Sequence, residues 1–100
     1  MFVALFAAAA IQAAPAPPPV IWIDPPRIET PPRALEAGAS GVVVLRCEFN
    51  TQGRATNCLV VSETPPGLGF GREALRGARM GRAQVDQAGP REVTLNFQTR

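Results

Sequence analysis

Cys47 and Cys58 are the two residues of this chain whose side chains carry a thiol, and ten residues separate them. That spacing differs from the close C-x2-C pairs of zinc sites and of thioredoxin-type redox sites. Two interpretations follow from the residues alone. The thiols are either buried and free, acting as small hydrophobic side chains, or joined in a structural disulfide. The cellular compartment and the strand register decide between them.

Catalytic side chains are sparse. The chain has no His, which removes the commonest general base and the commonest metal ligand. Four of its glutamates are singletons at expected strand or helix positions, and we interpret them as solvated charges: Glu48, Glu63, Glu73 and Glu92. The glycine-rich residues 67–71 lack the Lys-Ser/Thr of a phosphate loop, so they indicate a flexible start of a helix. We predict that the protein is not an enzyme and uses no cofactor, metal or small-molecule substrate.

The charge of the chain also limits its partners. Ten arginines and no lysine, against eight acidic residues, give a formal net charge of +2. The arginines are spread along the chain, which is too weak and too scattered for a nucleic-acid surface. We therefore predict no nucleic-acid partner.

The elements that position the cysteines form a β-hairpin. Residues 42–49 alternate, with Val43, Leu45, Cys47 and Phe49 on one face. Residues 50–53 (Asn-Thr-Gln-Gly) supply the turn, and residues 58–61 return. A two-residue loop at positions 52–53 places Cys47 opposite Cys58. A type I turn over residues 50–53, with Gly53 in a bulge, instead places Cys47 opposite Asn57. Both registers stay open.

The N-terminal third bears on compartment. Residues 1–11 are an uncharged apolar run, about half the length of a spanning helix, and they suit the apolar core of a secretory signal. We expect residues 1–14 to be a signal peptide or a truncated membrane anchor, which makes the protein exported. Export favours the disulfide between Cys47 and Cys58, because oxidising compartments retain such bonds and a small domain gains much from one.

Residues 15–32 hold eight of the eleven prolines, so we expect an extended, polyproline-like linker. Four apolar residues, 20–23, interrupt it and include the one tryptophan, Trp22. We favour their folding back on the domain as a clamp or added strand over a partner-docking motif, since exposed apolar runs are costly. Residues 33–100 then form one small domain.

One helix and one strand complete that domain. Residues 70–80 carry an apolar stripe of Phe70, Ala74, Leu75 and Ala78 opposite three arginines, which predicts an amphipathic helix. We interpret those arginines as a solvated face. Residues 81–90 read as a loop, and residues 92–99 alternate clearly. The right-handed crossover rule then gives an α+β fold with a three-stranded antiparallel sheet in the order two, one, three and one main helix across it.

In this order the last strand is an edge of the sheet. Its residues 93–98 lack the charges and prolines that normally block edge pairing. An extended peptide could add to it by strand addition. The candidate partner-binding residues are Val93, Thr94, Leu95, Asn96, Phe97 and Gln98.

The ordered set of motifs resembles the TonB C-terminal domain family over residues 31–98. It comprises a Gly-led strand, an Asn-x-x-Gly turn, a strand ending Val-x-Ser, an Ala-containing helix and a final strand ending in Phe. Here these are Gly41, residues 50–53, residues 60–62, residues 73–75 and residues 93–97. The proline-rich segment before the domain is also typical of that family.

The resemblance implies a periplasmic module that binds an extended peptide of outer-membrane transporters in energy-coupled transport. An inner-membrane motor complex would be a further partner if an anchor exists upstream. The alternative, from another class, is a small exported protein with a disulfide and a structural or interaction role but no part in transport.

Overall fold

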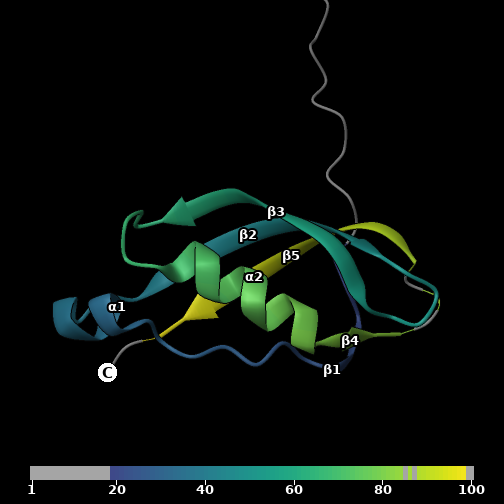
Figure 1. Cartoon of the computed structure of the whole chain (residues 1–100), viewed down its shortest axis with the longest axis horizontal. Helices are drawn as coiled ribbons and strands as arrows, with labels where there is room; N and C mark the ends of the chain where they lie inside the picture. The colour runs from purple at the N-terminus through teal and green to yellow at the C-terminus, as the bar shows by residue number, and fades with distance from the viewer. Residues whose placement is uncertain (1–18, 85, 87, 99–100) are drawn as a thin grey trace, which may run out of the picture.

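The computed structural model of the chain describes residues 19–84, 86 and 88–98. A three-stranded antiparallel sheet packs against helix α2 (Phe70–Met80). Its strands follow the order β3 (Ala55–Thr64), β2 (Gly41–Phe49) and β5 (Gly89–Phe97) (Figure 1). The predicted α+β fold and strand order are therefore confirmed.

Two short elements have no counterpart in the sequence analysis, helix α1 (Pro32–Ala37) and strand β4 (Arg82–Ala83). Strand β1 (Trp22–Asp24) pairs with β4 as a second small sheet, and it overlaps residues 20–23, for which an added strand was one expectation. Element boundaries also differ from expectation, since β3 covers Ala55–Thr64 rather than residues 58–61. Residues 81–90 were expected to be a loop, but they contain β4 and the start of β5, which begins at Gly89 rather than at Glu92. Elements of two to six residues are too short for a periodic pattern to reveal them.

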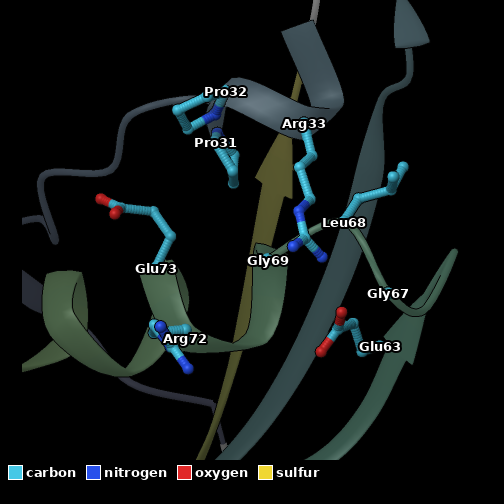
Figure 2. A pocket seen from close by; sticks show the side chains of 9 residues that line it. All are labelled: Pro31, Pro32, Arg33, Glu63, Gly67, Leu68, Gly69, Arg72 and Glu73. Atoms are coloured by element: carbon cyan, nitrogen blue, oxygen red, sulfur yellow. The ribbon is translucent and has the colours of Figure 1, made fainter. Parts of the chain in front are cut away.

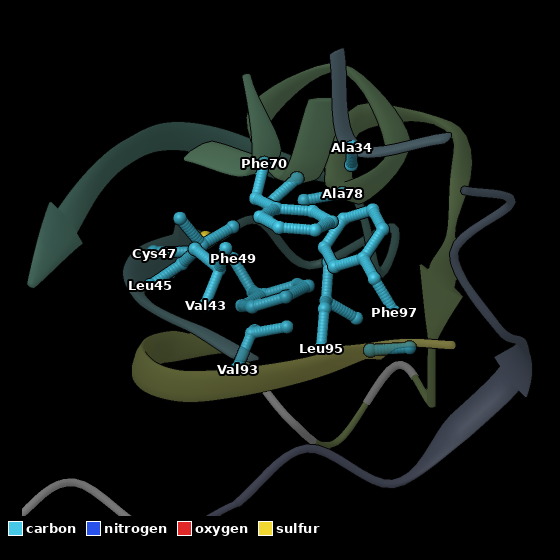
Figure 3. Packing of buried hydrophobic residues seen from close by; sticks show 12 residues of the cluster. Ala34, Val43, Leu45, Cys47, Phe49, Phe70, Ala78, Val93, Leu95 and Phe97 are labelled. Carbon is cyan, nitrogen blue, oxygen red and sulfur yellow. The ribbon is translucent and has the colours of Figure 1, made fainter. Parts of the chain in front are cut away.

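The core lies between α2 and the inner face of the sheet. Alternate residues of β2 and β5 point inward and meet Phe70, Ala74 and Ala78 of the helix, as the apolar stripe predicted. Figure 3 shows the Phe70 ring over this cluster beside Phe97, and the two ring centroids are 4.9 Å apart. Leu75, the fourth residue of the stripe, is only partly buried against the core.

Residues 19–31 are called the strap below, and from Trp22 onward they lie along one side of α2. The strap runs along the helix in the opposite direction, from Trp22 beside Gly81 to Ile28 beside Gly77. A Cβ atom at Gly77 would lie 2.6 Å from Ile28 Cγ2, so only glycine permits this approach. The Trp22 ring meets Phe49 edge-on at 5.6 Å between centroids. The predicted clamp is thus confirmed, and this part of the expected linker lies on the domain.

The hairpin combines both predicted registers. Gly53 has a φ of 81° and donates its N–H to the carbonyl of Asn50 at 3.1 Å, as in the second alternative. A bulge at Thr56 then shifts the pairing, because Phe49 faces Ala55 and Glu48 faces Asn57. Cys47 consequently faces Cys58, as in the first alternative.

Candidate docking edge of the sheet

Strand β5 ends the three-stranded sheet, so one side of its backbone has no neighbouring strand over most of its length within the described part of the chain. Among the described residues, one bridge touches this side, where Pro19 pairs with Glu92 in the parallel direction. Residues 93–98, the candidate partner-binding residues, have no strand partner there in the described part of the chain. We call residues 93–98 the docking edge.

The disulfide shows which backbone groups of β5 point away from the sheet. The Sγ atoms of Cys47 and Cys58 are 2.09 Å apart, in the pairing expected from the sequence. Their Cα atoms are 4.1 Å apart, near the spacing of a non-hydrogen-bonded antiparallel pair, which is about 4.5 Å. The N–H and C=O of Cys47 therefore point away from β3 and toward β5.

The alternation of inward and outward backbone groups continues through β5, because the β2–β5 register runs without a bulge over nine residue pairs. Cys47 faces Arg91, Leu45 faces Val93 and Val43 faces Leu95, and these pairs exchange backbone hydrogen bonds with β2. The intervening residues Thr94 and Asn96 must then present their N–H and C=O groups outward, at the docking edge.

The bridge at Pro19 independently supports the same assignment of outward backbone groups on β5. Proline has no N–H, so a bridge between Pro19 and Glu92 must use the backbone groups of Glu92. Glu92 is two residues from Thr94, and groups two residues apart in a strand point the same way. Two observations at opposite sides of the sheet therefore assign the outward groups to Glu92, Thr94 and Asn96.

The side chains of the docking edge alternate as predicted. Val93, Leu95 and Phe97 are 2%, 7% and 3% exposed and belong to the core. Thr94, Asn96 and Gln98 are exposed on the solvent face. The edge is therefore held rigidly by its buried residues while its outward backbone groups and uncharged polar side chains face water.

The opposite edge of the sheet, on β3, differs in its side chains. Leu59, Val60 and Val61 are 59%, 37% and 50% exposed, and Val42 on β2 is 41% exposed. Sequence analysis did not single out this apolar surface. The register between β2 and β3 shifts twice, next to Leu45 and next to Phe49. Such bulges twist an edge strand and discourage further pairing.

A charged cluster fixes the strap to α2. Arg76 forms an ion pair with Glu73, and its Nε lies 3.1 Å from each carboxylate oxygen. The backbone N–H of Glu29, in the strap, donates to Glu73 Oε1 at 3.1 Å. The interpretation of Glu73 as a solvated charge is therefore wrong, since only 17% of its side chain is exposed. The hydrogen bonds from Arg76, aided by that from Glu29, lower the pKa of Glu73 although burial opposes the shift.

A pocket of about 690 Å³ opens where α1, α2 and the end of β3 meet (Figure 2). Figure 2 shows charged side chains of all three elements around it, and none of its lining residues belongs to β5. Its lining comprises Pro31, Pro32, Arg33, Glu63, Gly67, Leu68, Gly69, Arg72 and Glu73. The pocket is thus separate from the docking edge. Gly69 is the N-cap residue of α2, so the glycine-rich segment does lie at the start of this helix.

The comparisons with known proteins support the fold. The solved structure described as the TonB2 protein from Vibrio anguillarum is similar to this chain, with a TM-score of 0.63 and 24% sequence identity over 93% of each chain. No protein-family model matches the chain, and no curated protein matches it in sequence. The chain therefore has a TonB-like fold, shown by structure rather than by sequence.

Two further observations bear on membranes and metals. Among the described residues, no helix is both long and apolar enough to cross a membrane. In the same part of the chain, no three His, Cys, Asp or Glu side chains come together as a metal-binding group. The expected signal peptide or anchor, residues 1–14, lies outside the described residues.

Proposed function

We propose that this protein is a TonB-like binding module that takes up an extended peptide of an outer-membrane transporter as an added strand on β5. The docking edge, residues 93–98, is the proposed site. The TonB-like fold is compatible with this role. The role in energy-coupled transport and the transporter partner follow from the family resemblance and are part of the proposal.

The observation that carries the proposal is the set of outward backbone groups at Thr94 and Asn96. Strand addition needs a row of unsatisfied N–H and C=O groups on a straight, accessible strand. The regular pairing of β5 with β2 provides such a row, and residues 93–98 include neither charge nor proline, although Pro90, Arg91 and Glu92 precede them in β5. Strand edges of this kind are normally blocked in proteins that do not use them.

We propose a periplasmic location for the module. The bond between Cys47 and Cys58 fits an oxidising compartment, which would retain it. If residues 1–14 belong to a membrane anchor, an inner-membrane motor complex is a second proposed partner.

Amide titration tests the proposal. The ¹⁵N-labelled chain is titrated with a synthetic extended peptide taken from the plug-side segment of an outer-membrane transporter. The expected result is that the largest amide shifts occur at Thr94 and Asn96. Shifts confined to β3, or an unchanged spectrum at millimolar peptide, would contradict docking at β5.

The alternative is an exported structural or interaction protein without a transport role. The disulfide and the strap, which stabilise a small domain, favour this function as well. The same titration separates the two, because the alternative predicts no selectivity for the transporter peptide over a scrambled sequence of the same composition.

A further inference from the structure

The strap contacts the same strand, β5, that carries the docking edge. At Pro19 the strap runs parallel to β5 and forms a bridge with Glu92, so the strap occupies the outward backbone groups of Glu92. Of the three outward positions on β5 between residues 92 and 96, the chain itself therefore takes the first. Thr94 and Asn96 are left for another segment.

The strap turns away from β5 directly after this bridge. The C=O of Ile21 accepts the N–H of Gln84 at 3.0 Å, and Trp22 faces Ala83 in β4. The Trp22 ring then packs against Phe49, beside the start of β5, because Phe49 faces Gly89. The strap thus leaves the edge within two residues of Pro19 and does not continue along residues 93–98.

We propose that Pro19 is an end-stop for the docking edge, which limits the segment that can be added and fixes where it ends. This inference rests on the proposed function and specifies the partner. A strand of six residues is about 20 Å long. The edge from residue 93 to residue 98 therefore accepts about five peptide residues in regular pairing. A longer peptide runs into the strap at Glu92.

The side chains beside the edge define the chemistry of that segment. Thr94, Asn96 and Gln98 are exposed and uncharged, so cross-strand neighbours on that face are uncharged polar or β-branched residues. Val93, Leu95 and Phe97 belong to the core on the other face, where apolar neighbours fit. The preferred partner is a short extended segment of alternating polar and apolar residues, with any charges outside its central five.

Trp22 holds the end-stop in place. Gly81 leaves room for it, since a Cβ atom at Gly81 would lie 2.8 Å from Trp22 Cζ3. If the Trp22 side chain is truncated, the strap loses its contact with Phe49 and the outward groups of Glu92 become available. The docking edge then gains one more outward residue, with two backbone hydrogen bonds, and longer peptides should bind about tenfold more tightly.

The test uses three blocked peptides of alternating Thr and Val, with three, five and seven residues, and the full chain labelled with ¹⁵N. For the native chain, affinity should rise from three to five residues and then change by less than twofold. For Trp22→Ala, it should rise about tenfold further from five to seven residues, with new shifts at Glu92. Ile23→Ala is the matched control, because Ile23 is the next residue of β1 and is 49% exposed.

Amide exchange of the free protein gives a second measurement that needs no peptide. The Glu92 amide should exchange more slowly than those of Thr94 and Asn96 in the native chain and in Ile23→Ala, and at a similar rate to them in Trp22→Ala. Shifts at Thr94 and Asn96 with a further gain in affinity to seven residues in the native chain would overturn the end-stop alone. If none of the peptides shifts Thr94 or Asn96, the proposed function fails, and the end-stop fails with it.

Discussion

The two edges of the sheet contrast in which property they expose. The β3 edge presents apolar side chains, with Leu59 and Val61 at least half exposed, on a strand whose pairing with β2 is broken by two bulges. The β5 edge buries its apolar side chains and exposes backbone groups in a register without a break. One edge therefore offers hydrophobic surface and the other offers hydrogen bonds.

This contrast separates two criteria that are often used together to find a binding surface. Exposed apolar area alone would select β3. Strand addition depends on main-chain hydrogen bonds for affinity and on alternate side chains for specificity, and it selects β5. The strap adds a second asymmetry, since it contacts β5 at Glu92, whereas the disulfide joins β3 to β2. The two edges are stabilised by different contacts, so a mutation at one edge should leave the stability of the other largely unchanged.

The largest expected effect comes from removing the disulfide. Replacing both Cys47 and Cys58 with Ala should lower the free energy of unfolding by about 3 kcal/mol, because the bond closes a short loop in the unfolded chain. Urea denaturation measures this loss. Amide exchange should accelerate more in β3 than in β5, and peptide affinity at β5 should change by less than twofold.

The native chain supplies the control for this experiment. Without reductant, its intact mass should be lower than that of the reduced chain by the mass of two hydrogen atoms. Two thiols that alkylate freely in protein prepared from the periplasm would contradict both the bond and the argument for export.

The second effect concerns peptide binding. Thr94→Pro removes an outward N–H from the docking edge and places a ring in the path of the added strand. Peptide affinity should fall by about tenfold or more, as measured by amide titration. Thr94→Ala keeps the N–H and should bind within twofold of the native chain.

The equivalent change on the other edge is Val60→Pro. The pairing of Val60 with Leu45, two residues from Cys58, places its N–H outward as well. Peptide binding at β5 should survive this substitution. A loss of binding in Val60→Pro together with normal binding in Thr94→Pro would move the docking site to β3.

The sequence predicted the parts of this comparison that depend on local pattern. Alternation in residues 42–49 and 93–97 and the stripe from Phe70 to Ala78 predicted these strands and the helix, because each is a repeat within one segment. The crossover rule then predicted the strand order. The candidate edge followed from strand order alone. The residues of the docking edge could therefore be named from the sequence.

Other features depend on contacts between distant segments and were missed. The bulge at Thr56 shifts the pairing of the hairpin so that Cys47 faces Cys58, and the residue type at position 56 does not predict a bulge. Gly77 and Gly81 each make room for the strap, and no pattern within the helix itself indicates this close approach. The ion pair of Glu73 with Arg76 lies within one helix turn and could have been predicted from the i, i+3 spacing. Its bond to Glu29 could not.

A smaller effect should follow from pH on the strap side of the molecule. The pKa of Glu73 is below its ordinary value of 4.5 in the folded protein, mainly because Arg76 donates hydrogen bonds to the carboxylate. The stability gained from this carboxylate is therefore present above the ordinary value and is lost as the pH falls through the lowered pKa. Thermal unfolding should show Glu73→Gln below the native chain at pH 7, with the gap narrowing as the pH falls below 4.5.

The size of this gap is limited because 49% of the Arg76 side chain is exposed and water screens the pair. Glu36→Gln on α1 is a suitable control, since Glu36 is an exposed glutamate on the other helix. A gap for Glu73→Gln that stays constant from pH 7 to pH 3 would show that the charge of Glu73 does not stabilise the strap.

The smallest effect is expected where the surface is most apolar. Leu59→Ala together with Val61→Ala removes exposed side chains from β3 without touching the docking edge or the core. Stability should change by about 0.5 kcal/mol or less, as for most surface positions. Peptide affinity at β5 should stay within twofold, measured by the same titration. A tenfold loss would mean that the apolar surface of β3 recruits the peptide. Exposed hydrophobic area, rather than a regular backbone, would then be the better guide to the site in this fold.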